Sequence, residues 1–192
     1  MIEEKKTGYY FYYIPLRRRG LTLKGIISFS YSYLPLIKDV VDAITFTGMG
    51  DTYSELGDSA KTVECYERAL ELNPLNSNTL NNYAYYLAQR AQDLDRAERM
   101  AALAVKDEPE NANYIDTYAW VFFAKKDYNM ALLYIKSAVE KDEDEHLYEH
   151  YGDILWFCDE KEAAVEQWTK ALELDPDNEL LQRKVKDKTY YE

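Results

Sequence analysis

The chain has 192 residues, of which 30% are charged and 15% aromatic, and its formal net charge is −12. The charge is uneven, since residues 1–42 carry seven Lys or Arg against four Asp or Glu, whereas residues 43–192 carry sixteen against thirty-one. Binding to nucleic acid depends on neutralising phosphates with cations. This composition therefore disfavours a nucleic-acid partner.

Residues 1–42 are predicted to form an irregular N-terminal segment. Glu3 to Lys6 open it with charges and no apolar core behind them, so no ordinary secretory signal is visible. Arg17 to Arg19, followed by the apolar run 26–37, share features with a twin-arginine signal, but Pro35 counts against it. The run is also shorter than the ~20 residues of a membrane span. We expect a cytoplasmic protein on this sequence, or a periplasmic one if a targeting segment is missing.

Within that segment a helix is predicted over about residues 22–36. Gly25, Phe29, Ser32 and Tyr33 alternate small and large residues at spacings that place them on one helical face. The same alternation recurs along the rest of the chain. We therefore interpret residues 22–36 as a degenerate copy of half the repeating unit described below.

From residue 40 onward the chain has the pattern of short amphipathic helices separated by turns at glycine and proline. Aspartates in three of these turns, Asp93, Asp127 and Asp159, are candidate N-caps. The last helix is expected to present Lys184 and its other polar residues to solvent, as a terminal cap requires. The expected helices span about 40–56, 59–72, 78–90, 94–107, 112–125, 128–141, 145–158, 161–174 and 179–188.

The clearest unit is residues 146–178. Its first helix carries a small residue, Gly152, three positions before a bulky one, Leu155. Its second helix repeats the alternation and is closed by a proline, with Ala164, Trp168, Ala171, Leu172 and Pro176 in these positions. A two-helix hairpin of this size cannot bury its own apolar face, so it must stack on copies of itself. Similar spacings recur at 43–76, 77–111 and 112–144.

This tandem pattern resembles the tetratricopeptide repeat (TPR), in the form found in bacterial proteins. The residues that carry the resemblance in the first three copies are Gly50, Tyr66, Ala69 and Pro74, then Ala84, Ala97, Ala101, Ala104 and Pro109, then Ala119, Ala131, Ile135 and Ala138. The copies depart from the family pattern at Thr62, where Ala is usual, and in the third copy, which lacks the closing proline. The resemblance implies an all-α fold, a right-handed superhelical solenoid of antiparallel helix pairs, with residues 179–192 as a C-terminal capping helix.

One short motif matches the sequence pattern of a catalytic site. His146, Glu149 and His150 match H-x-x-E-H, which belongs to one class of zinc peptidases. A catalytic zinc needs a third protein ligand and an enclosed cleft, so we interpret both histidines as polar residues on an exposed first turn. Cys65 and Cys158 lie in different repeats and are interpreted as structural. We expect no enzyme activity, no metal and no cofactor.

The resemblance also implies that the first helix of each repeat lines a concave groove. By register the groove positions are Ile44, Thr47, Ser54, Ala88, His146 and the partner-binding residues named below. None of these positions is Lys or Arg. The basic clamp with which some TPR domains hold the C-terminal carboxylate of heat-shock chaperones is therefore not expected. The predicted partner-binding residues are Asp51, Asn78, Asn81, Tyr85, Asn113, Asp116, Trp120, Phe123, Glu149, Asp153 and Trp156.

These residues predict the chemistry of a partner. Aromatic side chains are frequent anchors of interfaces, and the carboxylates favour a basic partner. Trp120 and Trp156 fit packing between neighbouring helices equally well. The leading hypothesis is a non-catalytic module that binds a basic or aromatic-rich peptide or protein segment in the groove. The alternative is a structural protein that forms a homodimer through its degenerate N-terminal half-repeat.

Overall fold

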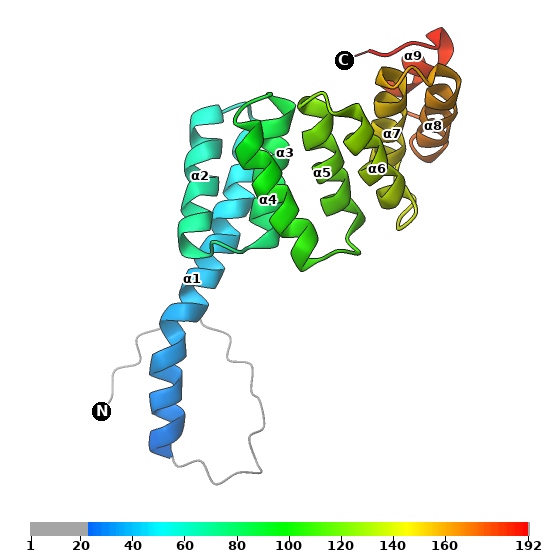
Figure 1. The fold of residues 1–192 in the computed structure, drawn as a ribbon. Coiled ribbons are helices and arrows are strands. Elements are labelled where there is room, and N and C mark those ends of the chain that lie inside the picture. The colour runs from blue at the N-terminus through cyan, green and yellow to red at the C-terminus, as the bar shows by residue number, and fades with distance from the viewer. Residues whose placement is uncertain (1–22, 192) are drawn as a thin grey trace. The chain divides into compact units, whose positions relative to one another are not determined.

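The structure is a computed structural model that describes residues 23–191, with side chains described from Lys38 onward. The chain divides into two compact units, Met1–Lys38 and Asp39–Glu192. Every regular element among the described residues is an α-helix, and from α2 onward the helices follow one another as short rods (Figure 1). Their bounds are α1 Leu23–Glu55, α2 Ser59–Leu72, α3 Ser77–Gln89, α4 Leu94–Asp107, α5 Ala112–Ala124, α6 Tyr128–Val139, α7 Glu145–Phe157, α8 Lys161–Leu174 and α9 Glu179–Asp187.

The predicted helices are confirmed from α2 to α9, each end lying within two residues of its expected position. The predicted break before residue 40 is wrong, because α1 runs without interruption from Leu23 to Glu55. The reason lies in the sequence after Pro35, where no glycine, asparagine or second proline occurs before Gly48 to end the helix. The part of the predicted irregular segment over 1–22 lies outside the described residues.

The caps agree in part with the prediction. Asp127 caps α6, since its carboxylate accepts the backbone N–H of Met130 at 3.1 Å. Asp159 does not cap α8, because it takes the left-handed residue of the turn with φ +65° and Glu160 becomes the N-cap. Asp93 stands at the N-cap of α4, but φ +39° leaves its side chain without a capping bond. Each of these three turns contains a left-handed residue, whose position the spacing did not predict.

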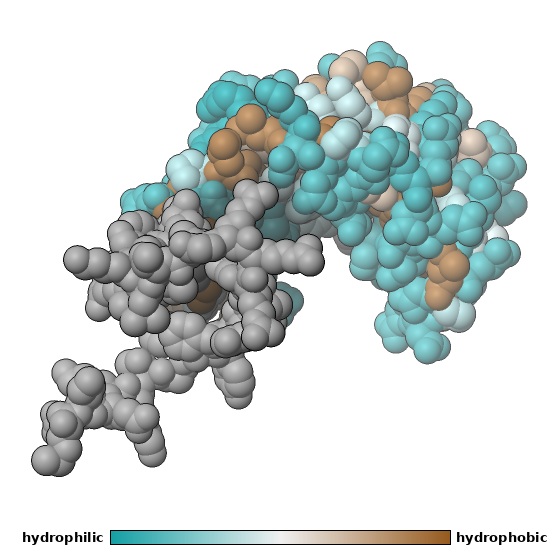
Figure 2. All heavy atoms as spheres, turned by 90° about the horizontal axis from the view of Figure 1, so that it is seen from below, coloured by the Kyte–Doolittle hydropathy of each residue, from teal (hydrophilic) through white to brown (hydrophobic). Residues whose placement is uncertain are grey.

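The core of Asp39–Glu192 consists of three adjoining clusters of buried side chains. Val105 and Tyr118 contact both the first and the second cluster, and Leu132 and Tyr151 contact both the second and the third. The apolar interior therefore passes from repeat to repeat. On the face in Figure 2 the described surface is mostly hydrophilic, with separate apolar spots.

The alternation of small and large residues seen in the sequence forms this core. The small residues of the pattern are fully buried, namely Ala69, Ala84, Ala97, Ala101, Ala104, Ala119, Ala131, Ala138, Ala164 and Ala171. Where the first helix has glycine instead of alanine, the second helix supplies an aromatic ring: Gly50 lies against Tyr66, and Gly152 lies against Trp168. Missing volume on one helix is thus filled by its partner, as close packing requires.

Candidate functional site

A groove of about 760 Å³ crosses the first helices of the repeats, α1, α3, α5 and α7. Six of the predicted binding residues line it, and these are Asp51, Asn78, Asn81, Tyr85, Asn113 and Asp116. Asn78 and Asn113 are exposed there, on the first turns of α3 and α5. The structure therefore brings together the predicted residues of the first two repeats with Asn113 and Asp116 of the third. The other five, Trp120, Phe123, Glu149, Asp153 and Trp156, are not part of its lining.

Asp51 is held in a hydrogen-bonded network inside the groove. Its Oδ1 accepts the hydroxyl of Tyr66 at 2.7 Å and the side-chain amide of Asn82 at 3.0 Å. Tyr66 is 2% exposed. Burial and this bond to the Asp51 carboxylate raise the pKa of the Tyr66 phenol. Asp51 therefore faces two neutral donors from its own chain.

Asp116 is paired with His150 of the next repeat. The Nδ1 atom of His150 lies 2.9 Å from Oδ1 and 3.0 Å from Oδ2 of Asp116. The side chain of His150 is only 13% exposed, so its predicted place on an exposed first turn is wrong. Burial by itself lowers the pKa of His150, but Asp116, with Asp153 and Glu149, outweighs it and the pKa is raised. The charged pair therefore stabilises the fold at low pH, and this contribution is lost as the pH rises through that pKa.

Glu149 and Asp153 bind a lysine of the chain itself. Lys184, from α9, lies with its Nζ atom 2.8 Å from Glu149 Oε1 and 2.8 and 3.0 Å from the two carboxylate oxygens of Asp153. The side chain of Lys184 is 1% exposed, so its predicted position on the solvent face of α9 is wrong. Asp153 also accepts the indole N–H of Trp168 at 2.8 Å. Because Lys184 already neutralises Glu149 and Asp153, these two carboxylates no longer indicate a basic partner.

Trp120 and Phe123 belong to a row of aromatic contacts beside the groove. Trp120 stacks on His150 with ring centroids 4.0 Å apart, and on Phe123 at 4.6 Å. Trp120 thus packs between α5 and α7. Packing between neighbouring helices was one of the two interpretations that the sequence left open for this residue. Trp156 is also partly buried, with its ring centroid 5.6 Å from that of Trp168. These aromatic rings support the stack of repeats.

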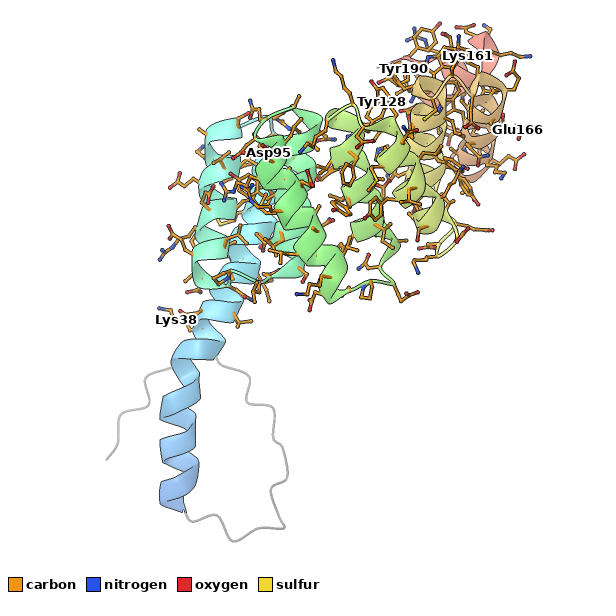
Figure 3. All side chains as sticks on the ribbon, in the orientation of Figure 1. Lys38, Asp95, Tyr128, Lys161, Glu166 and Tyr190 are labelled. Carbon is orange, nitrogen blue, oxygen red and sulfur yellow. The ribbon has the colours of Figure 1, made fainter. Side chains whose placement is uncertain are left out.

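The row of rings continues to the end of the stack. Phe157 packs against Phe123 at 5.1 Å, against Tyr128 at 5.3 Å and against Tyr190 at 5.1 Å. Tyr128 stands at the start of α6 and Tyr190 lies just beyond α9, as labelled in Figure 3. Phe157 remains 41% exposed.

Arg90 and Tyr86 are among the lining residues that sequence reasoning missed. Arg90 is the C-cap of α3, and its guanidinium lies over the Tyr86 ring with 3.9 Å from Cζ to the ring centroid. Both line the groove, so the expectation that no Lys or Arg faces it is wrong. The available signal was the i, i+4 spacing of an aromatic residue and a cation on one helix. It was missed because the register assigned the groove to Asn78, Asn81, Tyr85 and Ala88 of this helix, and to neither Tyr86 nor Arg90.

Two buried polar atoms of groove residues have no hydrogen-bond partner among the described residues, Asn81 Oδ1 and the Tyr86 hydroxyl. Asn81 is 9% exposed and Tyr86 is 2% exposed. Leaving such a group unsatisfied costs about 1–3 kcal/mol, and most buried polar groups in native proteins do have a partner. The groove therefore carries hydrogen-bonding capacity that the fold itself does not use.

The described residues show no metal site, no activated thiol and no membrane-spanning helix. Among the described residues, no three His, Cys, Asp or Glu side chains are grouped closely enough to hold a metal ion. Burial raises the pKa of both thiols, Cys65 and Cys158, which reduces their reactivity as nucleophiles. Within residues 23–191, no helix combines the length and apolarity needed to cross a bilayer.

Comparisons with known proteins agree with this architecture. Family models described as tetratricopeptide repeat match residues 45–74, 65–99 and 145–178. The TPR repeat-containing protein MJ1428 of Methanocaldococcus jannaschii is 30% identical over 122 residues, which are 64% of this chain and 21% of that protein. The chain thus spans about a fifth of the length of that relative.

Two solved structures show the same fold. Pseudomonas aeruginosa pilF superposes with a TM-score of 0.67 at 16% identity, covering 79% of this chain and 69% of that one. YrrB, described as a TPR protein with an unusual peptide-binding site, superposes with a TM-score of 0.55 at 18% identity, covering 84% and 80%. Helix pairs stacked in tandem, the small residues buried between them and the matching family models together show that the chain contains tetratricopeptide repeats.

Proposed function

We propose that this chain is a non-catalytic protein-interaction module that binds an extended peptide segment in the groove lined by the first helices of its repeats. The observation that supports this proposal is the groove of about 760 Å³, whose lining combines exposed amides with aromatic rings. Asn78 and Asn113 offer donors and acceptors that suit a peptide main chain. TPR proteins are in general interaction modules, and the fold-level neighbour YrrB is described as binding peptide.

The test is a selection of peptides from a random phage library on the immobilised full chain, followed by titration calorimetry. Asn113→Trp fills the groove from an exposed position, so we expect selected peptides to bind it at least about tenfold more weakly. Asn129→Trp is the matched control, because Asn129 is exposed, is also the second residue of its helix and lies outside the groove lining. Equal binding to both variants, or recovery of no peptide, would contradict the proposal.

The second candidate is self-association through the N-terminal part of the chain. Val41 is 55% exposed and Ile44 is 59% exposed on α1, and exposed apolar patches often mark contacts. Light scattering of the full chain gives its mass in solution. A dimer that becomes a monomer in Ile44→Glu would support this candidate, and a monomer in both proteins would remove it.

A further inference from the structure

The orientation of Asn81 in the groove follows from the network that begins at Asp51. The Asp51 carboxylate only accepts, so Asn82 must point its Nδ2 group to it, at 3.0 Å. The remaining oxygen of Asn82 accepts Nδ2 of Asn81 at 3.1 Å. This leaves the Oδ1 atom of Asn81 as an acceptor with no partner among the described residues. The group that would complete the network is therefore a hydrogen-bond donor, such as a main-chain N–H.

Arg90 and Tyr86 form the second part of the same lining. The Arg90 guanidinium lies over the Tyr86 ring, and among the described residues no carboxylate oxygen lies within 4.0 Å of it. The Tyr86 hydroxyl has no partner either. An unpaired cation and a buried, unpartnered hydroxyl thus belong to the same part of the groove lining.

The protein holds a completed version of this arrangement elsewhere. Arg96 lies over the ring of Tyr83, with 4.9 Å from Cζ to the ring centroid. There both groups donate to one carboxylate: the Tyr83 hydroxyl bonds Glu67 Oε1 at 2.9 Å and Arg96 Nη2 bonds Glu67 Oε2 at 2.8 Å. The pair of Arg90 and Tyr86 has the same two donors and lacks only the carboxylate. Glu67 shows what such a pair binds.

We propose that Arg90 and Tyr86 bind the side-chain carboxylate of an aspartate or glutamate in the peptide, while Asn81 accepts a main-chain N–H of that peptide. This inference rests on the proposed function and names the residue that the groove selects. A carboxylate accepts from both Tyr and Arg, and an Arg–carboxylate pair is among the stronger hydrogen-bonded contacts. An internal residue of an extended peptide has a free main-chain N–H next to its side chain, and this N–H can donate to Asn81 Oδ1.

The first experiment uses the phage selection with charge reversal. We expect peptides selected on the wild-type chain to be enriched in Asp or Glu, and Arg90→Glu to lose this enrichment and gain Lys or Arg. Arg99→Glu is the matched control, because Arg99 is exposed on α4, lies outside the groove lining and undergoes the same change of charge. Loss of acidic enrichment in both variants would mean that net charge, and not Arg90, selects the peptide, which overturns the inference.

The second experiment separates binding from stability with two isosteric variants. Tyr86→Phe removes an unpartnered hydroxyl, so we expect the melting temperature to be unchanged or higher while the affinity for a selected acidic peptide falls about tenfold. Tyr83→Phe removes a hydroxyl that Glu67 uses, so we expect a lower melting temperature and unchanged affinity. A Tyr86→Phe variant that binds as well as the wild type would overturn the inference.

The outcomes distinguish the two proposals. Peptides whose binding is lost in Asn113→Trp, but which show no acidic enrichment and no response to Arg90→Glu, leave the peptide-binding function standing and overturn the acidic preference. A Glu→Gln change in a selected peptide is expected to weaken its binding, and amidation of its C-terminus is expected to have no effect. An effect of amidation alone would assign the site to a terminal carboxylate and contradict the inference. Recovery of no groove-dependent peptide overturns both proposals.

Discussion

Replacing Lys184 by methionine is expected to lower the free energy of unfolding by about 3–5 kcal/mol, because it leaves a buried carboxylate without its cation. Asp153 is 4% exposed, and its two oxygens lie 2.8 and 3.0 Å from the Lys184 ammonium. Methionine keeps the apolar stem and removes only the charge. Urea denaturation followed by tryptophan fluorescence measures the loss, since the ammonium also lies 5.7 Å from the centroid of the Trp168 ring.

Lys186→Met is the control for this change. Lys186 lies two residues away on α9, is exposed and forms no ion pair among the described residues, so its loss is expected to change stability by less than about 0.5 kcal/mol. The effect of Lys184→Met should also shrink at low pH, since burial raises the pKa of Asp153 and a protonated carboxyl needs no cation. Equal stabilities of the two variants would show that the buried pair does not hold α9 in place.

The second expected result concerns two glycines of one helix. Gly50→Ala should destabilise the protein by about 1–3 kcal/mol, because overpacking a full core forces side chains or backbone to shift. A Cβ atom on Gly50 would lie 2.7 Å from two ring atoms of Tyr66. That ring has little freedom to move, since it stacks on Tyr83 with centroids 5.1 Å apart and its hydroxyl is bonded to Asp51. Thermal or urea denaturation measures the change.

Gly48→Ala provides the opposite expectation on the same helix. A Cβ atom on Gly48 meets nothing within 4 Å, and alanine favours a helix interior over glycine by about 1 kcal/mol. The variant should therefore be as stable as the wild type or more stable. The difference between the two substitutions isolates packing from helix propensity. If both variants were stabilised, this would contradict the close contact between Gly50 of α1 and Tyr66 of α2.

The sequence by itself determined the helices from α2 to α9 and the small residues on which they pack. Helix ends from α2 to α9 follow from turn residues and from the period of the apolar positions, which are local properties. The small residues at Gly152 and Ala164 also identified the interior beforehand, because a tandem hairpin can bury its apolar face only against its copies. The exception is α1, where a weak pattern around Pro35 suggested an end that the chain does not have.

Only the tertiary structure decided which polar residues are free to meet a partner. Asp116 meets His150 34 residues later, and Glu149 meets Lys184 35 residues later, so each of these partners lies about one repeat away. Several side chains lie at comparable separations, and the pairs that form depend on the angle between neighbouring repeats. A periodic pattern places residues on a face, but it carries no information on that angle. For this reason the sequence placed Asp51 and Asn81 in the groove, but it did not show that Asp116 and Glu149 are already paired within the chain.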